Sequence, residues 1–144
     1  MMKLQIFAAL VLILMSFNLQ ARDDRVKFPI AEVMERAKSE GMIDGSVKFL
    51  WGKKSNKKAK TTYGEITTNK KTNAFMKSDK EACDWAMLGA IKAFQQKAKS
   101  LGANAIVNIR SNYKHATFSS TEQYECGAGN VMAGVALKAD FVKQ

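Results

Sequence analysis

The feature that most limits the possible folds is a long helical segment that passes almost without a loop into a strand. Ser78 and Glu81 have the spacing of a capping box, in which the Ser hydroxyl accepts a hydrogen bond from the Glu81 N–H. Gly102 stands where a left-handed residue would end the helix. Between them, one face is apolar: Cys83, Met87, Ala90, Phe94, Ala98 and Leu101. This spacing predicts a long amphipathic helix with that face buried.

Strands are predicted on both sides of this helix. Alternating apolar residues at 105–109 indicate a strand directly after Gly102, and Pro29 and Gly41 bracket a further helix over 29–40. The other predicted strands are 46–51, 61–68, 122–127 and 131–141. We expect the first two of these to pair as a hairpin across the polar loop 52–60. The predicted class is α+β: one long amphipathic helix packed on a small, mainly antiparallel sheet, with an additional N-terminal helix.

Residues 1–21 have the features of a secretory signal peptide. Lys3 is followed by an apolar run from Leu4 to Phe17, and Leu19 and Ala21 occupy the −3 and −1 positions before Arg22. A membrane anchor is the alternative, but this run is shorter than the roughly 20 residues that span a bilayer. No cysteine lies near the cleavage position, which argues against a lipoprotein. We therefore expect a single periplasmic domain over residues 22–144.

Basic residues are concentrated in one part of the chain. Without Lys3, the chain has 22 basic and 13 acidic residues, a net charge of +9. Ten lysines but only two acids lie between Lys48 and Lys80. Such a segment either keeps the protein soluble or binds an anionic partner. The candidate anion-binding residues are Lys53, Lys54, Lys57, Lys58 and Lys60, with Trp51 and Tyr63 as aromatic neighbours.

The chain has two cysteines, Cys83 and Cys126. In an exported protein, an even number of cysteines favours a disulfide. A redox pair or a metal site is the alternative, but redox cysteines are usually two residues apart and a metal needs further ligands. We expect sheet-on-helix packing to bring the two cysteines together in a structural disulfide.

Four segments carry a resemblance to a known group of proteins: 68–75, 81–85, 102–108 and 124–129. The mature chain resembles small exported gammaproteobacterial proteins commonly labelled "excinuclease ATPase subunit". More distantly, roughly residues 80–140 are similar to the YbjQ-type domain, often labelled heavy-metal-binding, and to the outer-membrane stress sensor RcsF. The resemblance implies a YbjQ/RcsF-like fold in which the joint at Gly102 and Asn104 is scaffold.

The labels attached to these groups do not fit the residues of this chain. Gly52-Lys53-Lys54-Ser55 is the nearest approach to a phosphate-binding loop, but its order is wrong and no helix is predicted after it. We therefore expect no ATP. His115 is the only histidine, and no acidic cluster offers an oxygen cage, so we expect no metal or other cofactor.

No pattern of side chains indicates catalysis, and we predict a non-enzyme. His115 has hydroxyl neighbours at 119–121, but no acid is spaced to orient it. Glu122 and Glu125 are expected to face solvent. The remaining candidate acids, expected to offset the dipole at the start of the long helix, are Asp79, Glu81 and Asp84.

Two functions are compatible with these observations. The first is a periplasmic interaction module that binds an envelope protein, in the envelope stress response or as a peripheral part of an envelope assembly. The second is a binder of anionic ligands through the lysine-rich loop 53–60, with lipopolysaccharide, another glycan or a lipid surface favoured over nucleic acid. Basic residues beside aromatic ones suit such ligands.

Overall fold

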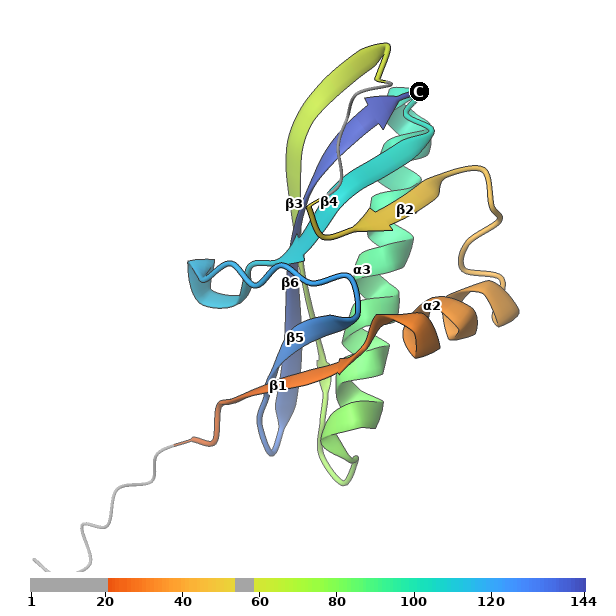
Figure 1. Ribbon diagram of the computed structural model, residues 1–144. Coiled ribbons are helices and arrows are strands. Elements are labelled where there is room, and N and C mark those ends of the chain that lie inside the picture. Colours follow the sequence, from red (N-terminus) through yellow and green to blue (C-terminus); the bar gives the residue numbers. More distant parts are fainter. Residues whose placement is uncertain (1–20, 54–58) are drawn as a thin grey trace, which may run out of the picture.

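The computed structural model describes residues 21–53 and 59–144. In these residues it is an α+β fold, with a mixed sheet of six strands and two α-helices (Figure 1). The elements are β1 (Asp24–Pro29), α2 (Ile30–Ser39), β2 (Lys48–Trp51), β3 (Thr61–Asn73), α3 (Asp79–Leu101), β4 (Ala105–Ser111), the 3₁₀ turn η1 (Tyr113–His115), β5 (Gln123–Ala128) and β6 (Met132–Lys143). The helix α3 packs across one face of the sheet, and α2 packs beside it.

The strand β6 is the centre of the sheet. Along one edge it pairs antiparallel with β3 over nearly its whole length. Along the other edge it pairs first with β5 and then with β4. The sheet therefore forks, because β5 continues to β1 and β4 continues to β2. The connection between β4 and β5, which contains η1, projects from the fork (Figure 1).

The expected hairpin between 46–51 and 61–68 is wrong. The strand β2 pairs parallel with β4, and β3 pairs with β6 instead. The physical reason is the length of the available ladder, because β6 pairs with twelve residues of β3. A hairpin with the four residues of β2 would offer far fewer pairs. Two strands that are neighbours in the sequence form a hairpin only when neither can form a longer ladder with another strand.

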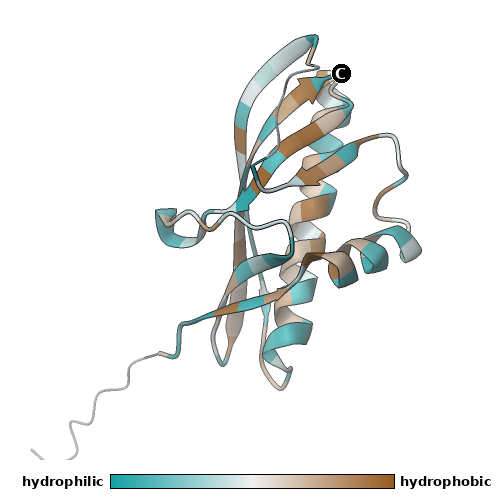
Figure 2. Cartoon of the chain, viewed as in Figure 1, coloured by the Kyte–Doolittle hydropathy of each residue, from teal (hydrophilic) through white to brown (hydrophobic). Residues whose placement is uncertain are grey.

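The long helix begins and ends at the residues that its sequence indicates. The Ser78 hydroxyl accepts a hydrogen bond from the Glu81 N–H at 3.1 Å, and Gly102 is left-handed with φ 80°. The apolar face lies on the sheet, where Phe94 meets Phe141 edge to face with ring centroids 5.0 Å apart. Hydrophobic residues follow this interface along α3 and β6 (Figure 2). The core therefore lies between α3 and the inner face of the sheet.

Two stretches of strand differ from the sequence expectations. The strand β1 was not predicted, because the charged residues Asp24, Arg25 and Lys27 hide the alternation of an edge strand. The strand β3 continues to Asn73, five residues beyond the end of the predicted strand 61–68. Pairing with β6, in which Asn69 lies opposite Ala136 and Lys71 opposite Gly134, stabilises this extension. No local signal in the polar sequence 69–73 indicates it.

The structural disulfide is confirmed. Cys83 and Cys126 are bonded, both are fully buried, and their Cα atoms are 6.0 Å apart. Cys83 lies early on α3 and Cys126 lies in β5. The bond therefore joins the start of the long helix to the sheet.

Candidate functional site on the open face of the sheet

The face of the sheet opposite α3 carries a small apolar cluster of Ala105, Val107 and Val142, and polar side chains elsewhere. Neighbouring residues of β3 show how the two faces differ. A Cβ atom placed on Gly89 of α3 would lie 3.6 Å from Cγ of Lys70. A Cβ atom placed on Gly134 of β6 would lie 3.4 Å from Cγ of Lys71. Lys70 therefore lies along the helix, and Lys71 lies across the opposite face, which we call the open face.

The ring of Tyr113 lies on two glycines of this open face. A Cβ atom on Gly127 would come within 2.0 Å of Cζ of Tyr113, and one on Gly134 within 3.9 Å of Cε2. The Tyr113 hydroxyl donates a hydrogen bond to Asp23 at 2.7 Å. Burial, reinforced by that hydrogen bond, raises the pKa of Tyr113 to about 12. The glycines thus let an aromatic ring rest directly on the backbone of β5 and β6.

The turn η1 holds two residues in the left-handed region. Lys114 has φ 50° and His115 has φ 60°, backbone values that residues other than glycine seldom adopt. Lys114 also forms an ion pair with Asp23, and together with the Tyr113 hydroxyl it lowers the pKa of that carboxyl. The turn is anchored by the N–H of Asn112, which donates to the carbonyl of Ala136 at 2.9 Å. Strain of this kind is concentrated at binding and catalytic sites.

A groove of about 400 Å³ lies between this turn and the strands β3 and β6. Its lining consists of Thr67, Thr68, Asn69, Lys71, Asn112, Tyr113, Lys114, His115, Ala136, Leu137 and Lys138. The lining thus contains three lysines, one histidine and no carboxylate. A second hollow of about 280 Å³ continues on the other side of Tyr113, toward Gly129 and Met132.

The three lysines of the groove differ in how their charge is compensated. Lys114 is paired with Asp23, and Lys138 lies 3.1 Å from Glu65. Lys71 is exposed and lines both hollows, and it has no ion pair within the described part of the chain. Among the three lysines of the groove, Lys71 is therefore the one whose charge has no ionic partner in residues 21–53 and 59–144.

The predicted lysine-rich site is only partly described. Lys53 and Lys60 are exposed, whereas Lys54, Lys57 and Lys58 lie outside the described residues. The aromatic residues predicted to accompany this loop, Trp51 and Tyr63, belong to the core on the α3 side of the sheet. Trp51 is only 8% exposed, because β2 turns this side chain into the core, so it cannot stack on a ligand. Tyr63 is half-buried and packs against the same core.

The carboxylates near the helix and β5 also differ from expectation. Glu125, expected to face solvent, is 6% exposed and accepts a hydrogen bond from Arg25 at 3.0 Å. Asp84, expected to act on the helix dipole, is buried and accepts from the Tyr124 hydroxyl at 2.6 Å and from Lys80 at 2.7 Å. Burial, followed by the bond to Asp84, raises the pKa of Tyr124. These groups lie in the interior and line neither hollow.

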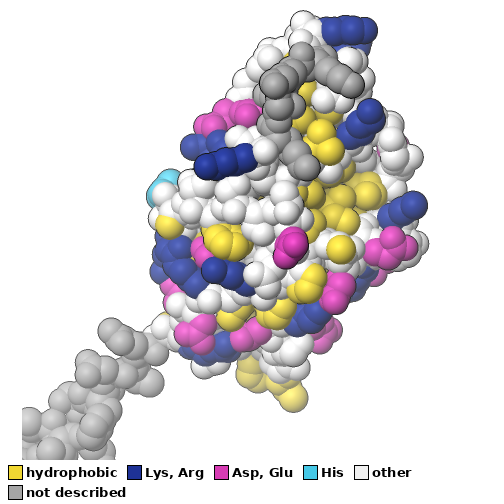
Figure 3. All heavy atoms as spheres, in the orientation of Figure 1, with side chains coloured by type: hydrophobic (Ala, Val, Ile, Leu, Met, Phe, Trp, Pro, Cys, Tyr) yellow, Lys and Arg dark blue, Asp and Glu magenta, His cyan; other side chains and the backbone are white. Residues whose placement is uncertain are grey.

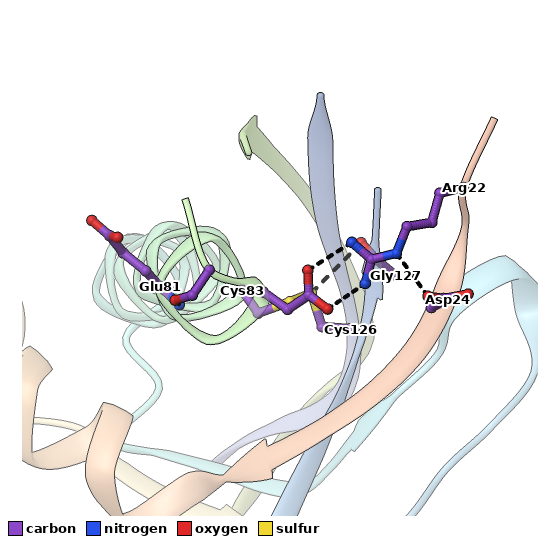
Figure 4. A network of polar contacts seen from close by, with 8 residues as sticks. Arg22, Asp24, Glu81, Cys83, Cys126 and Gly127 are labelled. Atoms are coloured by element: carbon purple, nitrogen blue, oxygen red, sulfur yellow. Dashed lines mark hydrogen bonds and ion pairs between the residues drawn. A yellow bond between two sulfur atoms is a disulfide. The ribbon is translucent and has the colours of Figure 1, made fainter. Parts of the chain in front are cut away.

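Arg22 connects β1 to the beginning of α3. Its guanidinium donates to Asp79 at 3.0 Å and to Asp24 at 2.7 Å (Figure 4). This contact lowers the pKa of Asp79. It lies beside the disulfide between Cys83 and Cys126, so a covalent and an ionic link hold the same end of the helix (Figure 4).

Sequence reasoning missed the groove residues Lys71, Tyr113 and Lys138. The predicted strand 61–68 ends before Lys70 and Lys71, so the alternation that places them on opposite faces was not expected there. A usable signal was the pair of small residues Gly127 and Gly134, since a glycine in a strand often marks a close approach by another group. What approaches them cannot be derived from the sequence, because Tyr113 is distant from both in the chain.

The chain matches no protein-family model, no curated protein and no solved structure. Over residues 21–53 and 59–144, no group of three or more His, Cys, Asp or Glu side chains is placed to hold a metal ion. The helices of the same residues lack the combination of length and apolar character that crossing a membrane requires.

Proposed function

We propose that this protein is a non-catalytic binding module of the periplasm, and that the groove on the open face takes a small anionic ligand rich in hydroxyl groups. The observation that carries the proposal is the lining of three lysines and one histidine without a carboxylate. Lys71 supports it most directly, because its charge has no ionic partner in the described residues. The ligand class is a phosphorylated or carboxylated sugar.

The neutral residues of the groove suit such a ligand. Asn69 and Asn112 offer amide donors and acceptors, and Thr67 and Thr68 offer hydroxyls. The ring of Tyr113 separates the groove from the second hollow and provides an apolar surface for a sugar ring. A few placed polar groups around one aromatic surface are typical of small-molecule sites. His115 has no carboxylate in this lining to orient it as a base, which favours binding over catalysis.

The test compares two neighbouring lysines. Lys71→Gln removes one positive charge from the groove, and Lys70→Gln is the matched control because that side chain lies along α3. Calorimetric titration with glucose 6-phosphate and glucuronic acid is expected to give binding that K71Q weakens about tenfold, since hydrogen bonds to charged groups contribute about 1.5–3 kcal/mol. Glucose is the uncharged control ligand.

Two results would overturn the proposal. One is equal affinity of K70Q and K71Q for both anionic sugars, which would place their site elsewhere. The other is the absence of any heat of binding or amide chemical-shift change with either probe at millimolar concentration.

The lysine-rich loop 53–60 is the alternative anion site. The polar sequence predicts a solvated loop here, and charges in such a loop contribute little to stability. Replacing Lys53, Lys54, Lys57 and Lys58 by Gln is therefore expected to preserve the melting temperature. Retention on heparin at low salt separates the two sites: loss in the loop variant and not in K71Q favours the loop.

A protein partner is the second candidate, and the outer edge of β3 favours it. Over the described residues, this strand of 13 residues pairs with β6 alone, which leaves one edge for strand addition. Thr67 and Thr68 are neighbours in β3, so the N–H of one points toward β6 and the N–H of the other points away from the sheet. Proline in place of the threonine whose N–H points away is expected to preserve the fold and to abolish capture of an envelope protein at moderate salt. Unchanged capture would exclude this edge.

The likeness to the YbjQ- and RcsF-type domains belongs to the same proposal. It is supported by the order of elements after Ser78: a long helix, the turn at Gly102, and three further strands. This order concerns the scaffold and does not identify the ligand.

A further inference from the structure

Two connections at one end of the molecule hold large apolar side chains in solvent. Phe75 and Met76, between β3 and α3, are 64% and 90% exposed. Val131 and Met132, at the turn from β5 into β6, are 61% and 48% exposed. We call these four residues the apolar tip. Figure 3 shows apolar side chains at the lower end of the molecule, where Figure 1 places both connections.

The apolar tip has a defined structure. The N–H of Ala74 donates to the carbonyl of Val131 at 2.7 Å, which joins the two connections. The side-chain Oδ1 of Asn73 accepts a hydrogen bond from the N–H of Phe75 at 2.7 Å, and the backbone carbonyl of Asn73 accepts one from Lys77 Nζ at 3.1 Å. Met76 has φ 59°, a left-handed value that is costly for a side chain of this size. Hydrogen bonds therefore hold an apolar side chain outward at a cost in backbone strain.

We propose that the apolar tip inserts into the headgroup region of an anionic bilayer. The tip is convex and small, and four side chains fall well short of the roughly 800 Å² per partner that a stable protein interface buries. Shallow insertion needs only a few apolar side chains with positive charge beside them. Lys77 follows Met76 directly, and residues 22–144 carry a net charge of +9.

The N-terminal end of the described chain lies beside the apolar tip. The described residues begin at Ala21, and Asp24 pairs with Ala128, just before the β5–β6 turn. A Cβ atom on Gly129, in that turn, would lie 2.9 Å from the carbonyl oxygen of Arg22.

This inference goes beyond the groove and does not require a ligand there. The second hollow does reach Gly129 and Met132, so the groove and the apolar tip are neighbours. The two sites are nevertheless separable by substitution, because Lys71 is not part of the tip and Met76 lines neither hollow.

The experiment is flotation of the exported protein with phosphatidylglycerol/phosphatidylcholine vesicles and with pure phosphatidylcholine vesicles. Replacing Phe75 and Met76 by Ser is expected to lower the partition coefficient about tenfold or more, because the inserted apolar area is lost. Trp85→Ser is the control, since Trp85 is 40% exposed but lies on α3 against Arg36. Phe75→Trp supplies a reporter whose emission is expected to shift to the blue on the mixed vesicles.

Three outcomes would overturn the inference. Flotation of the Phe75/Met76 variant equal to that of the unaltered protein would exclude the tip. Flotation lost in K71Q but kept in the Phe75/Met76 variant would mean that a headgroup binds in the groove. A protein that never floats, while the Phe75/Met76 variant loses a purified envelope partner, would make the tip a protein-binding surface.

Discussion

Gly127 shows how a single missing side chain shapes the open face. Its Cβ position lies 2.0 Å from Cζ of Tyr113, so any larger residue must displace the ring. The neighbouring backbone gives it no other reason to be glycine, since Gly127 is not among the glycines with positive φ. The requirement is therefore for space above the sheet.

We expect Gly127→Ala to lower the free energy of unfolding by about 1–3 kcal/mol, the usual range for overpacking. In a Tyr113→Ala background the same substitution is expected to cost much less, because the clash is gone. Urea unfolding of the four proteins measures this coupling. Equal costs in both backgrounds would show that Tyr113 does not rest on Gly127.

Asp23 and Tyr113 make a second prediction at this scale. Burial first, and then the bond to Asp23, raises the pKa of Tyr113 to about 12. Asp23→Asn is expected to lower that pKa but to leave it above 10, since burial remains. Absorbance titration of the phenolate measures it, with Tyr113→Phe as the reference for the other two tyrosines.

The pH dependence of stability follows from the same shift. Because the folded protein holds the Tyr113 proton more tightly than the unfolded chain, the stabilisation is complete below about pH 10 and is lost as the pH rises toward 12. A pKa unchanged by Asp23→Asn would contradict the role of this hydrogen bond.

Among the elements, α3 depends on its disulfide at one end. The bond closes a separation of 43 residues and holds Cys83 of α3 against Cys126 of β5. Replacing both cysteines by Ala is expected to lower stability by about 2–5 kcal/mol and to leave the topology unchanged. Urea denaturation with and without reductant measures the effect. Two free thiols in protein freshly isolated from the periplasm would contradict the structural role.

The elements also show what the sequence could and could not predict. The helix α3 was predictable because Ser78, Gly102 and the apolar face all give local signals. The partners of β2 and β3 were not, because pairing depends on the length of ladder that β6 offers far along the chain. The excess of lysines was visible in the sequence. The placement of Lys70 on one face of the sheet and Lys71 on the other was not, because it depends on the same pairing of β3 with β6.

At the scale of the whole molecule, we predict that the protein is exported to the periplasm. We expect the mature chain to begin at Arg22, whose side chain bonds to Asp24 and Asp79. N-terminal sequencing of protein from the periplasmic fraction checks the cleavage position. A chain that retains Met1 in the membrane fraction would contradict both the cleavage and the periplasmic location.

The central position of β6 has a consequence for the timing of folding. The strands β3, β4 and β5 all precede β6 in the chain, yet each takes it as a partner. Until residues 132–143 have emerged from the ribosome, the sheet lacks its central strand and α3 lacks a complete surface on which to pack. Folding of an incomplete chain is therefore disfavoured by the order of the strands alone.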